Sequence, residues 1–140
     1  LLNGNNNLCS ISSLVKKAVF DSLNGYDENL AYEDYDFWIR ASTIYNFDYV
    51  DKILVQKRVL KDSMYTLLTK KNNKKTRRFN YSTYLILQKA FKLNRTKEEF
   101  IAMLKRIHFE MTVAYKTRDF HLLMKYIFLE LKVRSTILYK

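Results

Sequence analysis

The stretch GYDENLAYEDYDFWIRAS, residues 25 to 42, is acidic in a chain that is otherwise basic. It places five carboxylates within ten positions of a 140-residue protein whose formal net charge is +11. The positive end of a helix dipole stabilises nearby acids, but capping accounts for one or two of them. Five acids therefore indicate a further role. They are Asp27, Glu28, Glu33, Asp34 and Asp36.

The segments around these acids alternate between helix and turn. A short helix over residues 16 to 23 is predicted to end at Asn24-Gly25, with Gly25 in the left-handed conformation that glycine adopts without strain. A second helix is predicted from about Glu33 to Ser42, so that its acids lie in the first turn and Arg40 near its end. Residues 47 to 59 are rich in β-branched and aromatic side chains, which predicts a strand or a bent pair of strands.

The remainder of the chain is predicted to be helical. Residues 64 to 70 and 82 to 93 are predicted as helices, with Asp62-Ser63 as an N-cap and a basic break at residues 70 to 78. Thr96 and Glu99 predict a capping box at the start of one helix, and Asp119 is predicted to cap the last helix. These two helices should form an antiparallel hairpin. Apolar spacing predicts one buried stripe on each. The stripes are Phe100, Leu104, Ile107, Met111 and Tyr115, then Phe120, Leu123, Met124, Ile127, Phe128 and Leu131.

Charge and composition bound the function. Residues 1 to 51 hold 3 basic and 8 acidic side chains, and residues 52 to 140 hold 22 and 6. The basic part favours a polyanionic partner, or it consists of solvated helix faces. The single Cys9 cannot form an internal disulfide, and no signal peptide or membrane-spanning run is found, which indicates a cytoplasmic setting. A start at Leu1 without methionine suggests a piece of a longer protein.

Residues 12 to 42, followed by YVDKILVQKR at 49 to 58, resemble the C-terminal part of the catalytic domain of family 2 glycosyltransferases, inverting enzymes with the GT-A fold. The matching pattern has a Gly-Tyr-Asp-Glu turn at residues 25 to 28, the Glu33-Asp34 pair that opens a helix, and then Asp36, Trp38 and Arg40. The resemblance covers about residues 5 to 63.

The resemblance implies roles for these residues. Asp34 would be the base that accepts the proton of the acceptor hydroxyl, with Glu33 beside it to orient the acceptor. Gly25, Asp27, Asp36, Trp38, Arg40 and Arg58 would contact substrate. The alternative for Asp34 is that it is only an acid that stabilises the helix N-terminus.

Parts of the family pattern are absent from the sequence. The nucleotide-binding half and its Asp-x-Asp metal motif have no counterpart, so this chain alone is expected to be inactive. A divalent metal, Mg or Mn, is expected in the complete enzyme with its ligands mostly outside this chain, and no metal ligand is assigned here. The family's Arg-x-His pattern is Arg58-Val59-Leu60 here, which keeps the phosphate-binding arginine and lacks the histidine.

These observations predict an α+β fragment that is predominantly α. Residues 1 to 63 would be the acceptor side of a GT-A α/β domain, and residues 64 to 140 a basic, amphipathic helical extension. The partners would be a nucleotide-sugar donor and a glycan or lipid-linked acceptor in cell-surface polysaccharide synthesis. The extension would either lie on the anionic cytoplasmic face of a membrane or pack on the catalytic domain.

Two other classes of function stay open. A basic half rich in aromatic residues is typical of nucleic-acid binding, and KKNNKKTRR at residues 70 to 78 would be its first contact. Against it, the acidic stretch would repel a polyanion and no nucleic-acid fold pattern is found. A helical structural adaptor is the third class.

Overall fold

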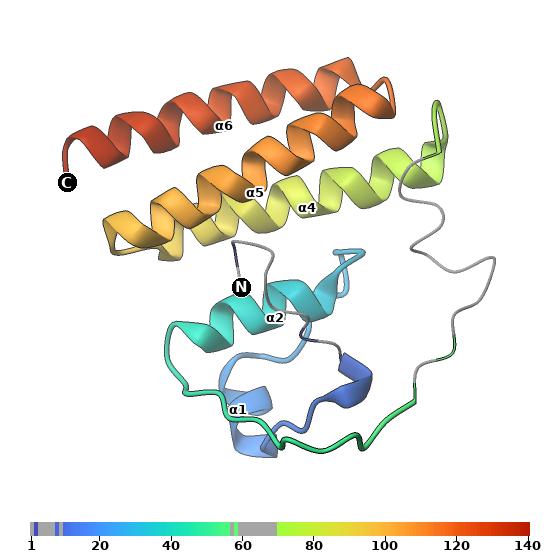
Figure 1. Ribbon diagram of the computed structural model, residues 1–140, viewed down its shortest axis with the longest axis vertical. Helices are drawn as coiled ribbons and strands as arrows, with labels where there is room; N and C mark the ends of the chain where they lie inside the picture. Colours follow the sequence, from blue (N-terminus) through green and yellow to red (C-terminus); the bar gives the residue numbers. More distant parts are fainter. Residues whose placement is uncertain (1, 3–7, 9, 57, 59–69) are drawn as a thin grey trace.

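The computed structural model describes residues 2, 8, 10–56, 58 and 70–140, and its regular structure is helical throughout these residues. The prediction of a predominantly α chain is therefore confirmed. Figure 1 shows α4, α5 and α6 side by side, with α2 and α1 on the side of α4 away from α6. The elements are the 3-10 turn η1 (Ser10–Ser12), α1 (Lys17–Ser22), α2 (Glu33–Ser42), α4 (Lys74–Leu93), α5 (Lys97–Lys116) and α6 (Phe120–Leu138).

The two last helices form the predicted antiparallel hairpin, and α4 lies along it. The turn between α5 and α6 is tight because Arg118 takes a left-handed φ of 60° and the Asp119 N–H donates to the Ala114 carbonyl at 2.9 Å. The interior between the three helices is apolar and close-packed. Its buried members include Leu87 from α4, Phe100, Met103 and Ile107 from α5, and Leu122, Tyr126, Leu129 and Val133 from α6.

Helix α2 is buried on two sides. Ile39, with Leu30 of the preceding turn, packs against Ile86 and Ala90 of α4. Its opposite side places Phe37, Trp38 and Ala41 against the apolar residues of α1 and its flanks, Val15, Val19, Phe20 and Leu23. A hydrogen bond from the Ala31 N–H to Ser82 Oγ, 2.8 Å long, further joins this region to α4. The acidic stretch is thus fixed to the helical half.

The predicted helix starts are confirmed at three positions. Helix α2 begins at Glu33, and Gly25 before it has a φ of +63° as the turn required. Thr96 and Glu99 form the capping box of α5, with the Thr96 side chain accepting from the Glu99 N–H and the Glu99 carboxylate accepting from the Thr96 N–H. Asp119 caps α6 by accepting from the Leu122 N–H at 3.1 Å.

The predicted basic break at residues 70 to 78 is wrong from residue 74 onward, because α4 already begins at Lys74. Asn73 is its N-cap and accepts from the N–H groups of Lys75 and Thr76. The basic side chains of this first part are exposed while Thr76 and Asn80 are buried, so one buried face suffices to hold the segment as a helix. The predicted cap at residues 62 and 63, the helix over residues 64 to 69 and Cys9 lie outside the described residues.

The predicted strand at residues 47 to 59 is also wrong for residues 47–56 and 58, which carry no regular structure. A strand needs a neighbour to satisfy its backbone N–H and C=O groups, and the structure describes none beside it. Its apolar side chains are open to solvent, up to an exposed fraction of 95% for Ile53. The β-branched and aromatic residues of this segment favour an extended conformation, but a strand forms only when tertiary structure brings a second strand beside it.

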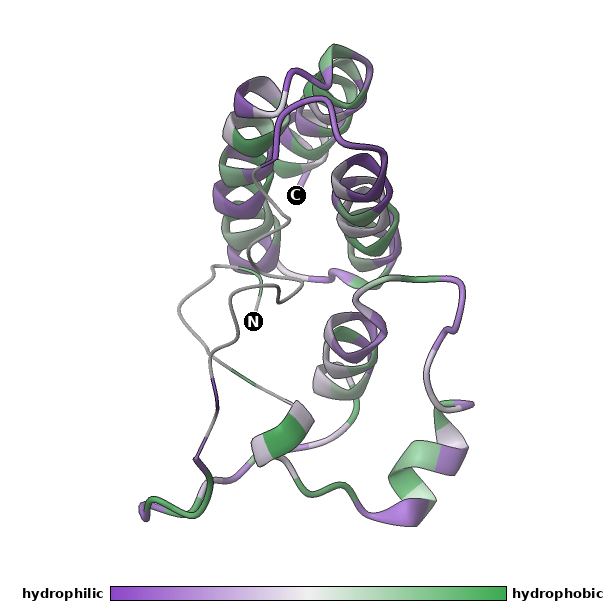
Figure 2. Cartoon of the chain, turned by 90° about the vertical axis from the view of Figure 1, so that its right-hand side faces the viewer, coloured by the Kyte–Doolittle hydropathy of each residue, from purple (hydrophilic) through white to green (hydrophobic). Residues whose placement is uncertain are grey.

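The predicted stripes of the hairpin are only partly correct. On α5, Phe100 and Ile107 are buried as expected, whereas Tyr115 is exposed. On α6 four of the six positions predicted to be buried are exposed, namely Phe120, Met124, Phe128 and Leu131, and the other two, Leu123 and Ile127, are half-buried. The buried face is instead Leu122, Tyr126, Leu129 and Val133, because α6 is apolar on two faces and periodicity alone cannot choose between them. Figure 2 shows hydrophobic and hydrophilic residues around the turns of the helices.

None of the described helices combines the length and the apolar character needed to cross a lipid bilayer.

Candidate functional site

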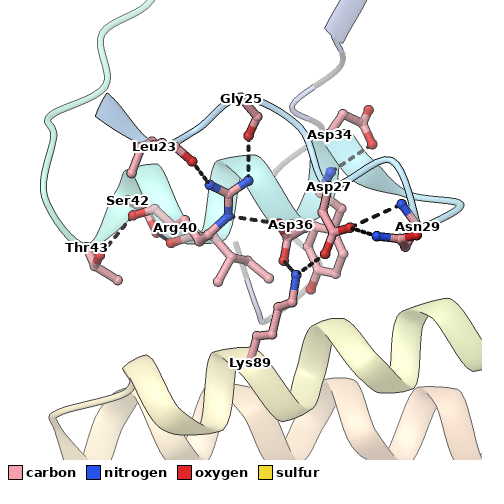
Figure 3. Close-up of polar contacts among 12 residues, drawn as sticks. Leu23, Gly25, Asp27, Asn29, Asp34, Asp36, Arg40, Ser42, Thr43 and Lys89 are labelled. Carbon is pink, nitrogen blue, oxygen red and sulfur yellow. Dashed lines mark hydrogen bonds and ion pairs between the residues drawn. The ribbon is translucent and has the colours of Figure 1, made fainter. Parts of the chain in front are cut away.

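Arg40 connects the end of α2 to the turn around Gly25. Its Nε donates to Asp36 Oδ2 at 2.8 Å, one helical turn earlier on α2 (Figure 3). Its two other nitrogens donate to the carbonyls of Leu23 at 2.5 Å and Gly25 at 2.8 Å. The planar guanidinium therefore donates to one carboxylate and two backbone oxygens at once, which its rigid arrangement of N–H donors allows. This contact fixes the turn relative to the helix.

Lys89 of α4 completes the network from the other side. Its Nζ lies 2.6 Å from Asp27 Oδ2 and 3.1 Å from Asp36 Oδ1 (Figure 3). The side chain of Asp36 is 2% exposed, so this buried carboxylate is balanced by two cations, Arg40 and Lys89. We call Asp27, Asp36, Arg40 and Lys89 the acid–base brace.

The brace shifts the pKa values of two of its members. The hydrogen bond from Lys89, together with that from the Asn29 N–H, lowers the pKa of Asp27. Burial alone would lower the pKa of Lys89, but its hydrogen bonds to Asp27 and Asp36 outweigh this and raise it. Both groups are therefore held in their charged forms at neutral pH.

Glu33 and Asp34 lie outside the brace, in the first turn of α2. Both are half-buried, and neither forms an ion pair with a described residue. Asp34 Oδ1 accepts from the N–H of Tyr35 at 2.7 Å, which orients the carboxylate, while no described residue donates to its other oxygen. Of the five acids in residues 25 to 36, Asp27 and Asp36 are held by cations, whereas Glu28, Glu33 and Asp34 form no ion pair with a described residue.

A shallow depression of about 440 Å³ opens beside the turn that precedes α2. Gly25, predicted to contact substrate, lines it, together with the aromatic rings of Phe20 and Tyr26 and the carboxylates of Asp21 and Glu28. Neither Glu33 nor Asp34 is among its lining residues. Aromatic rings combined with carboxylates are chemically suited to a polyhydroxylated ligand, whose ring stacks on an aromatic face and whose hydroxyls donate to oxygens.

Trp38 and Arg58 are placed differently from the other predicted substrate contacts. Trp38 is buried between Phe37 and Phe47, with ring centroids 5.1 and 5.9 Å away, and its Nε1 has no hydrogen-bond partner among the described residues. Arg58 is exposed. Substrate contacts for Asp27, Asp36, Trp38, Arg40 and Arg58 stay predictions, and the distances above give the first four a structural role.

Sequence reasoning missed Lys89 and a second buried anchor. Lys89 is 62 positions from Asp27, so no local spacing connects them, and its one signal is a cation inside the apolar run of α4. In the second anchor, Arg106 of α5 lies 5.4 Å from the centroid of the Tyr35 ring and 2.7 Å from Glu110. Burial raises the pKa of Glu110, and it raises that of Tyr32 to about 12.

Within the part of the chain that the structure describes, no group of three or more histidine, cysteine, aspartate or glutamate side chains is arranged to hold a metal ion. His108 pairs with Glu130 at 2.9 Å. Asp27 and Asp36, the two acids of the brace, both form ion pairs with Lys89. The described residues therefore offer no fit for the divalent metal expected of the complete enzyme.

Comparisons with protein-family models, with curated proteins and with solved structures found no match to this chain.

Proposed function

We propose that this chain is the C-terminal segment of an inverting, family 2 glycosyltransferase of the GT-A fold, with Asp34 as the catalytic base. The observation that carries the proposal is the division of labour among the acids of residues 25 to 36. Asp27 and Asp36 are neutralised by Lys89 and Arg40, whereas Asp34, like Glu28 and Glu33, forms no ion pair with a described residue. Among these three acids, the resemblance assigns the role of base to Asp34.

The chemistry needs such a carboxylate. In an inverting transfer the acceptor oxygen attacks the anomeric carbon, its proton passes to the base, and the nucleotide leaves from the opposite face of the sugar. The hydrogen bond from the Tyr35 N–H holds one oxygen of Asp34, so the other can accept the proton in a defined orientation. Glu33, the preceding residue in the first turn of α2, would accept a hydrogen bond from a second acceptor hydroxyl.

The brace supports the proposal by positioning α2. Arg40 holds the Gly25 carbonyl and Lys89 holds Asp27, so the turn and the helix that bears Asp34 move as one unit with α4. The depression beside Gly25 and Tyr26 would receive a part of the acceptor, a glycan or a lipid-linked saccharide, away from the reacting hydroxyl, because Asp34 does not line it. The nucleotide-binding half of the complete enzyme would hold the donor and most ligands of the Mg or Mn ion.

The experiment is made in the complete enzyme, with Asp34→Asn and Asp34→Ala. Loss of a general base lowers turnover by about 100-fold to 10,000-fold, and donor binding should not change. A matched control is Asp48→Asn, because Asp48 Oδ1 accepts from the N–H of Tyr49 at 2.8 Å, the same local contact outside α2. Undiminished turnover of the Asp34 variants contradicts the assignment. The isolated chain is expected to have no transferase activity, and measurable turnover would contradict that.

A nucleic-acid-binding module is the second candidate function. It is favoured by six exposed cations around the start of α4, where positive charge opposes the helix dipole. A bound polyanion would offset this charge. They are Lys70, Lys71, Lys74, Lys75, Arg77 and Arg78. Salt-sensitive binding to heparin and duplex DNA, without binding to anionic vesicles, would favour this function. A structural adaptor binds neither.

A further inference from the structure

Helix α6 is apolar on two opposite faces, and the structure covers one of them. Leu122, Tyr126, Leu129 and Val133 are buried against α4 and α5. The opposite side carries five apolar side chains with exposed fractions between 49% and 84%. Their spacing of four, four, three and seven residues keeps them in one line along the helix. We call these the α6 outer face: Phe120, Met124, Phe128, Leu131 and Leu138.

Cations border this face on both sides. Towards α4, Lys132 Nζ lies 4.9 Å from the Phe91 ring centroid, and Lys125 Nζ lies 5.8 Å from each of the Tyr81 and Tyr84 rings. Their aliphatic stems thus run over aromatic rings while the charges stay at the surface. Towards α5, Arg134 is exposed beside Glu130.

Carboxylates are nearly absent from this side of the molecule. Helix α4 has six basic and no acidic side chains, and α6 has three basic and one acidic. That one acid, Glu130, is neutralised by Arg134 at 2.7 Å and contacts His108 at 2.9 Å. The acidic stretch, by contrast, lies across α4 from α6 (Figure 1). The molecule therefore has a basic side on which α6 is the outermost apolar element.

A groove between α4 and α6 adjoins the outer face. Its volume is about 280 Å³, and its walls include Phe91 and Phe128 together with Lys92 and Lys132. Both lysines are exposed. Apolar walls with two ammonium groups match an anionic amphiphile, whose phosphate would meet the lysines and whose chain would meet the rings.

We propose that the α6 outer face docks in the plane of an anionic lipid bilayer, with its apolar residues among the acyl chains and Lys92, Lys125, Lys132 and Arg134 at the lipid phosphates. A stripe of exposed apolar side chains bordered by cations is the pattern of helices that lie on membranes. Charge selects the bilayer over a second copy of the chain, since pairing two such faces would bring their basic borders together. The inference stands on α6 and does not depend on the transferase proposal.

The test uses the 140-residue chain and vesicles of phosphatidylcholine, with and without phosphatidylglycerol. Flotation should recover the chain with the anionic vesicles and leave it free with the neutral ones, and high salt should reduce the binding. Replacing Phe128 and Leu131 by serine should weaken the binding by about tenfold or more. The matched control is Phe109→Ser, an aromatic side chain exposed to a similar extent on α5.

Charge is tested separately. Lys132→Glu should abolish the preference for anionic vesicles, whereas Lys105→Glu, an exposed lysine on α5, should keep it. Circular dichroism and thermal unfolding establish that each variant is folded.

Four outcomes would overturn the proposal. The first is that wild-type chain stays free of anionic vesicles. The second is that the Phe128 and Leu131 variant binds as tightly as Phe109→Ser, which reduces the contact to charge alone. The third is a dimer that the same variant dissociates, which makes a second copy the occupant. Full competition by inorganic phosphate at matched ionic strength also counts against docking, since it indicates a site for free phosphate.

Discussion

Lys89 Nζ on α4 lies 2.6 Å from Asp27 Oδ2 in the turn before α2, although the two residues are 62 positions apart. This ion pair joins the acidic part of the chain to its basic part. The same ammonium group is 3.1 Å from the buried carboxylate of Asp36, so one lysine serves two acids. The placement of Asp34 on α2 therefore depends on a residue of the helical half.

Lys89→Met should lower the free energy of unfolding by about 1 to 2 kcal/mol, because it leaves the buried Asp36 with Arg40 as its remaining cation. The effect is kept modest by the partial exposure of Lys89, which screens its charge. Urea unfolding at neutral pH measures it. Lys92→Met is the control on the same helix, since no described carboxylate contacts Lys92, and an equal loss in both variants would argue against the brace.

Gly25→Ala should destabilise the chain by about 1 to 2 kcal/mol through the left-handed φ of +63° alone. A Cβ at this position would also lie 3.0 Å from two atoms of the Phe20 ring. The two causes separate in a Phe20→Leu background, where the steric part of the loss should shrink and the backbone part should stay. Thermal unfolding of the four chains gives the comparison. A tolerated alanine would mean that Gly25 is not needed for the turn.

Thr96→Ala should cost about 1 kcal/mol, because the Glu99 N–H loses its acceptor at the start of α5. Thr112→Ala is the internal comparison. The Thr112 hydroxyl donates to the His108 carbonyl within the same helix, and alanine there improves helix propensity, so no loss is expected. Chemical denaturation followed by circular dichroism measures both, and a cap variant as stable as the parent would contradict the capping role.

The stability of the chain should fall below about pH 4.5, and Glu99 should contribute to that fall. The hydrogen bonds that its carboxylate accepts from the Thr96 and Arg95 N–H groups lower the pKa of Glu99 below its ordinary 4.5. The folded state then binds fewer protons than the unfolded one, so the contribution is present above the unfolded pKa and is lost as the pH falls through the folded pKa. Urea unfolding from pH 7 to pH 3 should show a shallower decline for Glu99→Gln, and an unchanged slope would rule out its contribution.

Local signals predicted the parts of the fold that depend on neighbouring residues. The Asn24-Gly25 turn, the start of α2 at Glu33 and the caps at Thr96 and Asp119 are each set within a few positions, and each is confirmed. The choice of buried face on α6 depends on which helix packs against it. Because both faces of α6 are apolar, the sequence could not decide between Leu122 and Phe120 as core residues.

The sequence predicted those features of the candidate site that depend on neighbouring residues, and it did not predict contacts between distant residues. The acids of the stretch could be named from sequence, but their division into braced and unpaired groups depends on Lys89, which reaches Asp27 and Asp36 from α4. A cation that arrives from another helix leaves no trace in local spacing. The strand at residues 47 to 56 failed for the related reason that strand formation requires a partner.

The described residues 47–56 and 58, which carry no regular structure, also have a consequence for protease digestion. Lys52 and Arg58 are exposed and outside regular structure, so trypsin should cut there before it cuts the helices. The two pieces would not separate at once, because Leu30 and Ile39 pack on Ile86 and Ala90 and Lys89 holds Asp27 across the break. A nicked chain that elutes from a sizing column as one species would behave as a noncovalent complex of two complementary fragments, with the acidic stretch as one partner and the basic helices as the other.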